Sequence, residues 1–453
     1  MNNYNKEYIH ISDPKLARVI RGKIGIDSDE PIPVQNLTSI EILTAVYIYI
    51  RDLSGIEHLT ELKNLNLYAN NEIEDLSPLA NLKKLTHLTL YDNKIKDITP
   101  LAGLRQLHTL FLNMNDISDF TPIADLSQLR SLWLGSNPIQ DLSHIYRLLK
   151  RFPLLTNLSM NRLQISSVAP FAEYEQLTEL WLEGNDISDI TPLAKLTNLE
   201  FLRLCNNKIK DISPLKGLAR IESLRLVNND ISDITPLTEL RQLNLLDLHN
   251  NDIRDITPLT NLTQLASLYL HNNKISDIKP LANCSQLTNL YLHNNKVKDI
   301  SPLKGMTHLR WLSLKSLEIS DISILTHLTK LKYLYLDHNP IIDITPLSEL
   351  KELWILHLNG ITVNDISPLS ELTQLHRLSI EGCNINDITP LAGLETLREL
   401  RIADNNIRDV SIVENLPHLK TLTIKGNPIQ DMTPIHKLHQ QNPKLKLDID
   451  LPA

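Results

Sequence analysis

Hydrophobic residues recur along this chain in a fixed order that repeats about every 22 residues. One copy begins at Leu82 and the next begins at Leu104. Each copy has leucines first, then an asparagine, an isoleucine, an aspartate and Ser/Thr-Pro-Leu. The copy that starts at Leu82 continues with Leu85, Leu88, Leu90, Asn93, Ile95, Asp97, Ile98, Pro100 and Leu101. The same order returns 17 times between Leu53 and Pro434.

Each copy predicts a strand, a tight turn and a short helical turn. Residues 88–90 read Leu-Thr-Leu, which is the alternation of a strand with leucines inward and Thr89 outward. Asn93 follows at a turn, where its side chain is expected to face inward and bond the backbone of adjacent turns. Thr99 is expected to cap a helical turn that begins at Pro100, because threonine and proline favour those positions.

A period of this length with L-x-x-L-x-L-x-x-N is the signature of leucine-rich repeats. A unit this short cannot bury its own apolar face, so units must stack and share one core. We therefore predict an α/β fold, a leucine-rich-repeat solenoid in the form of a curved right-handed horseshoe. Its parallel sheet is expected on the concave side and its short helical turns on the convex side.

Three regions are predicted along the chain. Residues 1–36 form an N-terminal helical cap, with a helix over 11–21 that Asp13 caps. Residues 37–440 form an array of about 18 coils, and residues 441–453 form a C-terminal cap or tail.

One stretch of the array departs from the pattern. The coil that begins at Leu126 has four additional residues, and the next coil has Leu163 in place of Asn and Ser167 in place of Asp. We predict a seam near 137–168, with a true α-helix over 145–152 and a local change of twist.

The net charge of −8 follows from the repeat. Aspartate recurs at one register in 17 coils, from Asp52 to Asp431. These carboxylates are interpreted as a structural column, so the net charge does not indicate the kind of partner.

Function is expected at the outward strand positions that the repeat leaves free. Aromatic residues make up only 5% of the chain, yet they occupy six of the 17 outward positions between the paired leucines. Exposed aromatic side chains on a rigid sheet are typical of binding hot spots. The predicted partner-binding residues are Phe111, Trp133, Trp181, Arg203, Arg225, Tyr269, Tyr291, Trp311, Tyr333 and Tyr335.

These aromatic residues fall into two clusters. The first contains Phe111, Trp133 and Trp181, and small polar residues between the tryptophans predict a cleft there. The second runs from Tyr269 to Tyr335. The alternative is that the rings only stack on their neighbours across strands and stabilise the sheet.

Two charged features accompany the clusters. His249, His271 and His293 recur one coil apart. They could bind a metal ion through their imidazoles, or they could be solvated residues that were duplicated with the repeat. Arg203 and Arg225 are expected side by side on neighbouring strands, with carboxylates around them. This mixture of charges favours a protein partner over the phosphate backbone of a nucleic acid.

Other classes of function leave no signal in the sequence. No P-loop, His-Glu-x-x-His, Gly-x-Ser-x-Gly or Cys-x-x-Cys motif is present. We therefore expect no enzymatic activity, no cofactor, no nucleic acid, no membrane contact and a monomer. Residues 1–13 contain no apolar leader, and three cysteines are too few for a disulfide framework. The expected location is cytoplasmic, or secreted if the chain is a trimmed form.

The pentapeptide Asp-Ile-Thr-Pro-Leu at 97–101 and the segment Ile-Ser-Asp-Pro-Lys-Leu at 11–16 resemble bacterial internalin-like leucine-rich-repeat proteins. The resemblance covers essentially residues 9–440. It implies a protein partner bound on the concave face, as for an adaptor, a regulator or an adhesin. Related phosphatase-regulating proteins with 22-residue repeats imply the alternative of a subunit that controls an enzyme. A metal-dependent binder or an enzyme that uses the histidines is the remaining alternative.

Overall fold

The computed structural model describes residues 8–26 and 31–449. The chain forms two compact units, Met1–Lys208 and Ile209–Ala453. Residues 1–7 and 27–30 of the predicted N-terminal cap, and residues 450–453 of the predicted tail, lie outside the described residues. Within the described part, no helix combines the length and the apolar character that a membrane span requires.

Each unit is built on a parallel sheet with one three-residue strand per coil. In the first unit the strands are β3 (Ile42–Thr44), β4 (Asn64–Asn66), β5 (His87–Thr89), β6 (Thr109–Phe111), β7 (Ser131–Trp133), β8 (Asn157–Ser159), β9 (Glu179–Trp181) and β10 (Phe201–Arg203). In the second unit they are β11 (Ser223–Arg225), β12 (Leu245–Asp247), β13 (Ser267–Tyr269), β14 (Asn289–Tyr291), β15 (Trp311–Ser313), β16 (Tyr333–Tyr335), β17 (Ile355–His357), β18 (Arg377–Ser379), β19 (Glu399–Arg401), β20 (Thr421–Thr423) and β21 (Lys446–Asp448).

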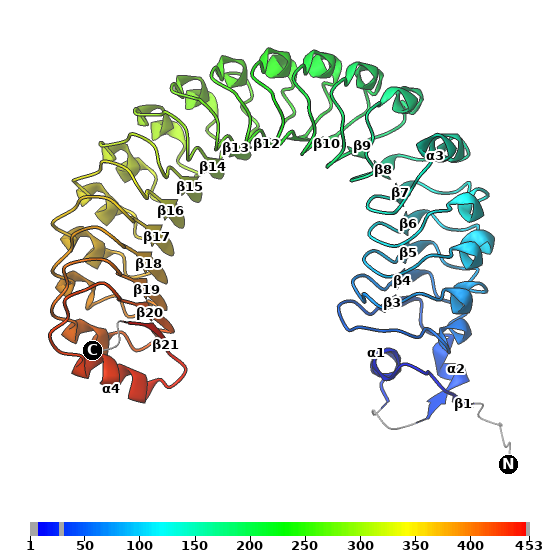
Figure 1. Ribbon diagram of the computed structural model, residues 1–453, viewed down its shortest axis with the longest axis horizontal. Helices are drawn as coiled ribbons and strands as arrows, with labels where there is room; N and C mark the ends of the chain where they lie inside the picture. The colour runs from blue at the N-terminus through cyan, green and yellow to red at the C-terminus, as the bar shows by residue number, and fades with distance from the viewer. Residues whose placement is uncertain (1–7, 27–30, 450–453) are drawn as a thin grey trace. The chain divides into compact units, whose positions relative to one another are not determined.

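Register within each sheet follows directly from the repeat. The middle leucine of one strand lies beside the middle leucine of the next, as Leu180 lies beside Leu202 and Leu290 beside Leu312. These leucines are fully buried, so the residues on either side of them point outward. In each unit the strands line one side of the coils and the helical turns line the other (Figure 1). We call the outward side of the sheet the strand face.

The helical turns opposite the strands are 3-10 helices in most coils. In the first unit they are Ile56–His58, Ser77–Leu79, Thr99–Gly103, Thr121–Ile123, Ala169–Glu173 and Thr191–Lys195. In the second unit they are Ser213–Gly217, Thr235–Glu239, Thr257–Leu259, Lys279–Asn283, Ser301–Gly305, Ser323–His327, Thr345–Glu349, Ser367–Glu371, Thr389–Leu391 and Ser411–Asn415. Proline occupies the first turn of all but three of these helices, because its missing N–H costs nothing there.

The aspartate column caps these turns, and the predicted cap by Thr99 is wrong. The backbone N–H of Thr99 donates to Oδ1 of Asp97 at 2.8 Å. The same bond joins Thr235 to Asp233 and recurs in other coils. Aspartate is favoured because its carboxylate reaches the N–H group two residues ahead, which the short helix leaves without a partner.

Inward-facing asparagines connect each coil to the one before it. The side-chain amide of Asn251 donates to the carbonyls of Leu226 and Leu248 at 2.9 and 3.0 Å. Its oxygen accepts from the N–H of Ile231 at 3.1 Å. Asn251 is only 8% exposed. Equivalent bonds at most coils form an asparagine ladder, which confirms the inward orientation predicted for this column.

The residue before each ladder position adopts a left-handed backbone conformation. Asparagine fills this place in five successive coils, from Asn206 to Asn294, with φ between 52° and 56°. Asparagine tolerates positive φ better than most residues. The repeated Asn-Asn pair therefore has two separate causes, one for each asparagine.

A short helix covers the start of the first unit. Helix α1 (Pro14–Ile24) begins three residues after the predicted start at Ile11, and the predicted cap is confirmed, with Asp13 accepting from the N–H groups of Lys15 and Leu16 at 2.8 and 3.2 Å. It ends three residues beyond the predicted Arg21. The other oxygen of Asp13 accepts from the N–H of Arg51 at 2.9 Å, so one carboxylate both caps the helix and fastens it to the first coil. The strands β1 (Tyr8–Ile9) and β2 (Ile32–Pro33) pair antiparallel, and helix α2 (Val34–Leu37) follows.

The irregular coil of the first unit contains an α-helix, α3 (Leu142–Leu149). It begins and ends three residues earlier than predicted, because Asp141 of the aspartate column serves as its N-cap. Ile145, Leu148 and Leu149 are buried against the array. The accompanying change of twist stays a prediction. In the second unit, helix α4 (Thr433–Gln441) follows the last regular coil.

The asparagine ladder predicts a defined cost of removal. We expect Asn251→Ala to lower the free energy of unfolding by about 1–3 kcal/mol, because it leaves buried backbone groups without partners. Urea titration monitored by circular dichroism measures this change. Gln264→Ala, an exposed change one coil away, is the matched control and should be neutral. Equal midpoints for the two variants would contradict a buried ladder.

The aspartate column predicts a loss of stability in acid. Hydrogen bonds from the side chain and the backbone N–H of the threonine two residues ahead lower the pKa of Asp97, Asp233 and Asp343. A carboxyl with a lowered folded pKa stabilises the fold above its unfolded pKa of about 4, and this contribution is lost as pH falls through the folded pKa. We therefore expect the urea midpoint to fall steeply below about pH 4. A midpoint that does not change there would contradict the capping role.

Candidate partner-binding face

The predicted binding residues all lie on the strand face of the two units. Each is half-buried, with its backbone held in a strand whose middle leucine is fully buried. The rings therefore cannot turn into the core, which leucines already fill. Phe111, Trp133, Trp181 and Arg203 belong to the first unit, and the remaining residues belong to the second.

The first aromatic cluster, Phe111, Trp133 and Trp181, is a continuous stack. The ring centroids of Phe111 and Trp133 are 4.0 Å apart, and those of Trp133 and Trp181 are 4.5 Å apart. The guanidinium of Arg203 lies 3.9 Å from the ring centroid of Trp181 and extends the stack by one strand. A guanidinium over an indole face is an attractive cation–π contact.

The cleft predicted between the two tryptophans is wrong. Ser159 lies between Trp133 and Trp181 in the register of the sheet. Because serine is small, the two indoles lean together across it and leave it only 1% exposed. The first aromatic cluster therefore presents a continuous ring surface.

The second aromatic cluster joins Tyr269, Tyr291, Trp311, Tyr333 and Tyr335 in one group. Its rings stack from one strand to the next, with centroids 4.7 Å apart for Tyr269 and Tyr291 and 4.4 Å apart for Trp311 and Tyr333. Tyr335 lies 5.6 Å from Trp311. Burial raises the pKa of Tyr291 and Tyr335, so both hydroxyls remain protonated and can donate.

Two indole N–H groups in the clusters lack a partner. Nε1 of Trp181 and Nε1 of Trp311 are buried, and neither bonds to any acceptor among the described residues. A buried N–H without an acceptor costs about 1–3 kcal/mol. Each cluster therefore contains one enclosed indole donor that the described residues leave without an acceptor.

The three predicted histidines form a stacked column beside the second cluster. Their rings lie face to face, with centroids 4.1 Å apart for His249 and His271 and 4.2 Å apart for His271 and His293. Parallel stacking does not converge their nitrogens on one point. Among the described residues, no group of three His, Cys, Asp or Glu side chains is placed to hold a metal ion.

Hydrogen bonds anchor both ends of the histidine column. Nδ1 of His249 lies 2.6 Å from Oδ1 of Asp247, which is nearly buried. Nδ1 of His293 lies 3.0 Å from the hydroxyl of Ser313. Burial and the neighbouring imidazoles lower the pKa of His271 to about 3, and burial and Lys315 lower that of His293 to about 4. Both rings are therefore neutral at pH 7.

Arg203 and Arg225 belong to different units, so their predicted position side by side stays a prediction. Within the first unit, Arg203 lies 3.9 Å from a carboxylate oxygen of Glu183. In the second unit, Arg225 lies beside Asp247 in the register of the sheet.

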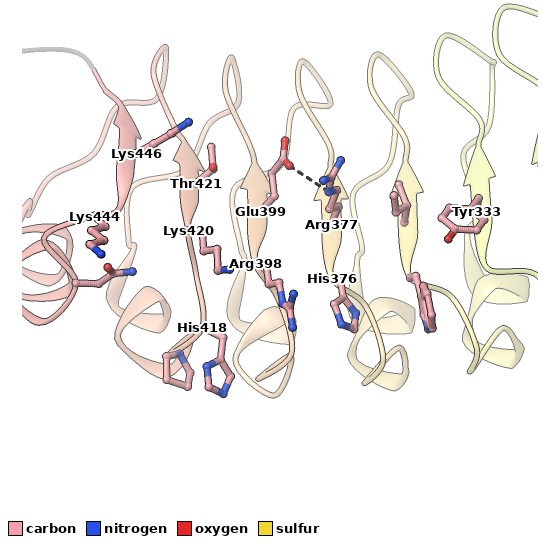
Figure 2. Close-up of a pocket in the computed structure, with 14 residues that line it drawn as sticks. Tyr333, His376, Arg377, Arg398, Glu399, His418, Lys420, Thr421, Lys444 and Lys446 are labelled. Carbon is pink, nitrogen blue, oxygen red and sulfur yellow. Dashed lines mark ion pairs between the residues drawn. The ribbon is translucent and has the colours of Figure 1, made fainter. Parts of the chain in front are cut away.

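The structure reveals a basic pocket that the sequence reasoning missed. It lies in the second unit at the last coils, has a volume of about 880 Å³ and is lined by Arg398, Lys420, Lys444 and Lys446 among other residues (Figure 2). Its signal was the residue just before each strand, which reads Lys332, Trp354, His376, Arg398 and Lys420 in successive coils. This column lies outside the strands, whereas the predicted binding residues all lie within them.

Comparisons with known proteins identify the repeat. A family model described as Leucine Rich repeats (2 copies) matches residues 83–126, 175–217, 263–305 and 395–435, and one described as Leucine rich repeat matches 285–341. No curated protein matches the chain. Leucine-rich-repeat solenoids are generally non-catalytic binding scaffolds.

Three solved structures are similar to the chain. An internalin (inlF) of Listeria monocytogenes is 31% identical, over 86% of this chain and 95% of that one, with a TM-score of 0.47. A leucine-rich-repeat protein of Leptospira interrogans is 22% identical, over 92% and 97%, with a TM-score of 0.56. The plant peptide hormone receptor RGFR1, in complex with RGF2, is 20% identical, over 86% and 75%, with a TM-score of 0.59. The last two show the fold alone.

The histidine column predicts a further dependence of stability on pH. Because the folded pKa of His271 and of His293 lies below the ordinary histidine pKa of about 6.5, the unfolded chain binds more protons than the folded one as pH falls below that value. The free energy of unfolding should therefore decrease between about pH 6.5 and pH 4. Urea titration across this range should show a shallower decrease for His271→Gln. The exposed His308→Gln is the control, and identical profiles for wild type and His271→Gln would contradict the prediction.

Proposed function

Since the chain belongs to the internalin-like leucine-rich-repeat proteins, we propose that it is a non-catalytic scaffold that binds a protein partner through its strand face. The observation that carries the proposal is the pair of aromatic clusters. Both stand on a sheet that the repeat already stabilises, at positions where the core requires no aromatic residue. An adaptor, a regulatory subunit and an adhesin would all use this surface, and the identity of the partner distinguishes them.

Rigidity supports binding at these clusters. Each ring is held by a neighbour at stacking distance, as Trp133 is held between Phe111 and Trp181. A side chain fixed before binding loses little conformational entropy when a partner covers it. Tyrosine and tryptophan combine a large apolar area with a polar group, which is why they dominate hot spots.

Ligand binding by a protein of the same fold also supports the proposal. The solved plant receptor of the same fold, which is in complex with RGF2, is an instance of this architecture with a bound ligand.

We expect Trp181→Ala and Tyr291→Ala each to weaken partner binding by about 2 kcal/mol, roughly thirtyfold. The partner is first captured from an extract of the source cells with the immobilised wild-type chain, and is then titrated calorimetrically against each purified variant. One substitution lies in each unit, so the two results report on the clusters separately.

Lys195→Ala, at the end of the 3-10 helix Thr191–Lys195 and away from the strand face, is the control and should bind as wild type does. Thermal unfolding of each variant verifies that the array remains folded. Normal binding by both folded aromatic variants would refute the proposal. Collapse of the fold in those variants would instead assign the rings to packing between strands.

A further inference from the structure

The basic pocket occupies the strand face where the last strands of the second unit begin. Arg398 and Lys420 directly precede β19 and β20, and Lys444 and Lys446 come from the segment that forms β21. Figure 2 shows the side chains of Arg398 and Lys420 in one row along the starts of these strands, with Lys446 farther along the sheet. Neighbouring strands are about 4.8 Å apart, so the cations succeed one another at short intervals.

The charge of this pocket is not neutralised by the protein. Arg398, Lys420, Lys444 and Lys446 are exposed, and none forms an ion pair with a carboxylate among the described residues. The single carboxylate in the lining is Glu399, which is already held by Arg377 at 3.4 Å and by Arg401 at 2.7 Å.

This local excess of positive charge contrasts with the rest of the chain, whose net charge is −8. Elsewhere exposed lysines are commonly paired, as Lys274 is with Asp252 at 2.6 Å and Lys351 with Glu371 at 2.5 Å. Charges of one sign that line a hollow reinforce each other's field and attract a ligand of the opposite sign.

The pocket is continuous with the second aromatic cluster. Tyr333 belongs to both, and its ring lies 6.3 Å from that of Trp354 in the pocket lining. The ring of Trp354 is already contacted by the ammonium of Lys332, 4.6 Å from its centroid. In the column of residues just before the strands, Trp354 and His376, with ring centroids 5.8 Å apart, are followed by the cations Arg398 and Lys420.

We propose that the basic pocket binds an acidic peptide segment of the partner protein, rich in Asp and Glu. The inference rests on the proposed function and names the chemistry of one part of the partner. Carboxylates of the segment pair with Arg398, Lys420, Lys444 and Lys446, and the fork of Arg398 takes a carboxylate through two parallel N–H···O bonds. The partner then continues from the pocket across Tyr333 to the second aromatic cluster.

A fluorescent peptide of alternating Glu and Asp is the probe, and fluorescence anisotropy against the full chain measures its Kd. The double variant Arg398→Gln/Lys420→Gln should weaken binding by about tenfold or more, because two charge-assisted contacts are lost. Lys216→Gln/Lys304→Gln removes the same charge from exposed 3-10 turns of the same unit and should leave the Kd unchanged. A peptide of alternating Gln and Asn should not bind.

Three results would overturn the proposal. If the pocket variant and the matched charge control lose the same affinity for the acidic peptide, the peptide is attracted by the overall charge of the unit and not by the pocket. Equal binding of the Gln/Asn peptide would show that carboxylates are not recognised. Tighter binding of single-stranded DNA of the same charge at the same residues would assign the pocket to nucleic acid. Trp181→Ala, in the other unit, should leave the Kd of the acidic peptide unchanged, so failure of the pocket and failure of the aromatic clusters are distinguishable.

Discussion

The asparagine ladder is the interaction on which the solenoid depends. Every coil must turn sharply after its strand, and the turn leaves backbone N–H and carbonyl groups in a dry interior. One asparagine side chain supplies both donors and an acceptor, so it completes its own turn and fastens the preceding coil, as Asn273 does with Leu248, Leu270 and Ile253. Without these bonds, each turn would bury unsatisfied backbone groups at a cost that leucine packing would have to offset.

Other residues replace the asparagine at 163, 317, 361 and 383. Where leucine replaces the asparagine at 163, Asn185 of the following coil accepts from the N–H groups of both Leu163 and Ile165. Where cysteine replaces it at 383, the thiol lies 3.1 Å from the carbonyl of Leu358 and takes the place of the amide donor. The array therefore tolerates leucine, isoleucine or cysteine at this position in some of its coils.

The fold was predictable because its causes are periodic. Leucines at fixed spacing determine which side of every strand is buried, and they correctly predicted the inward asparagines, the parallel sheet and an α-helix in the irregular coil. The prediction failed where the outcome depends on the sizes of particular neighbours. Nothing in the register of Trp133 and Trp181 states that a serine between them lets the indoles meet. Thr99 has the residue type of a helix cap. The sequence alone does not indicate that the carboxylate of Asp97 accepts from the N–H of Thr99 and forms the cap instead.

Different positions of the repeat serve folding and binding, which explains how the strand face can be stable and still be free to bind a partner. Leucines, asparagines and aspartates meet the needs of folding at three registers, so the outward strand positions vary without harm to the core. Rings at those positions stack on each other, and stacking alone would explain why the side chains there are aromatic. Stacking does not account for the buried N–H groups of Trp181 and Trp311, because a purely structural stack gains nothing from a donor without an acceptor. Phenylalanine at the same places would stack and leave no donor unpaired. The indole N–H groups themselves are enclosed by their neighbours, so the surface that these tryptophans offer to the proposed partner is the area of their rings.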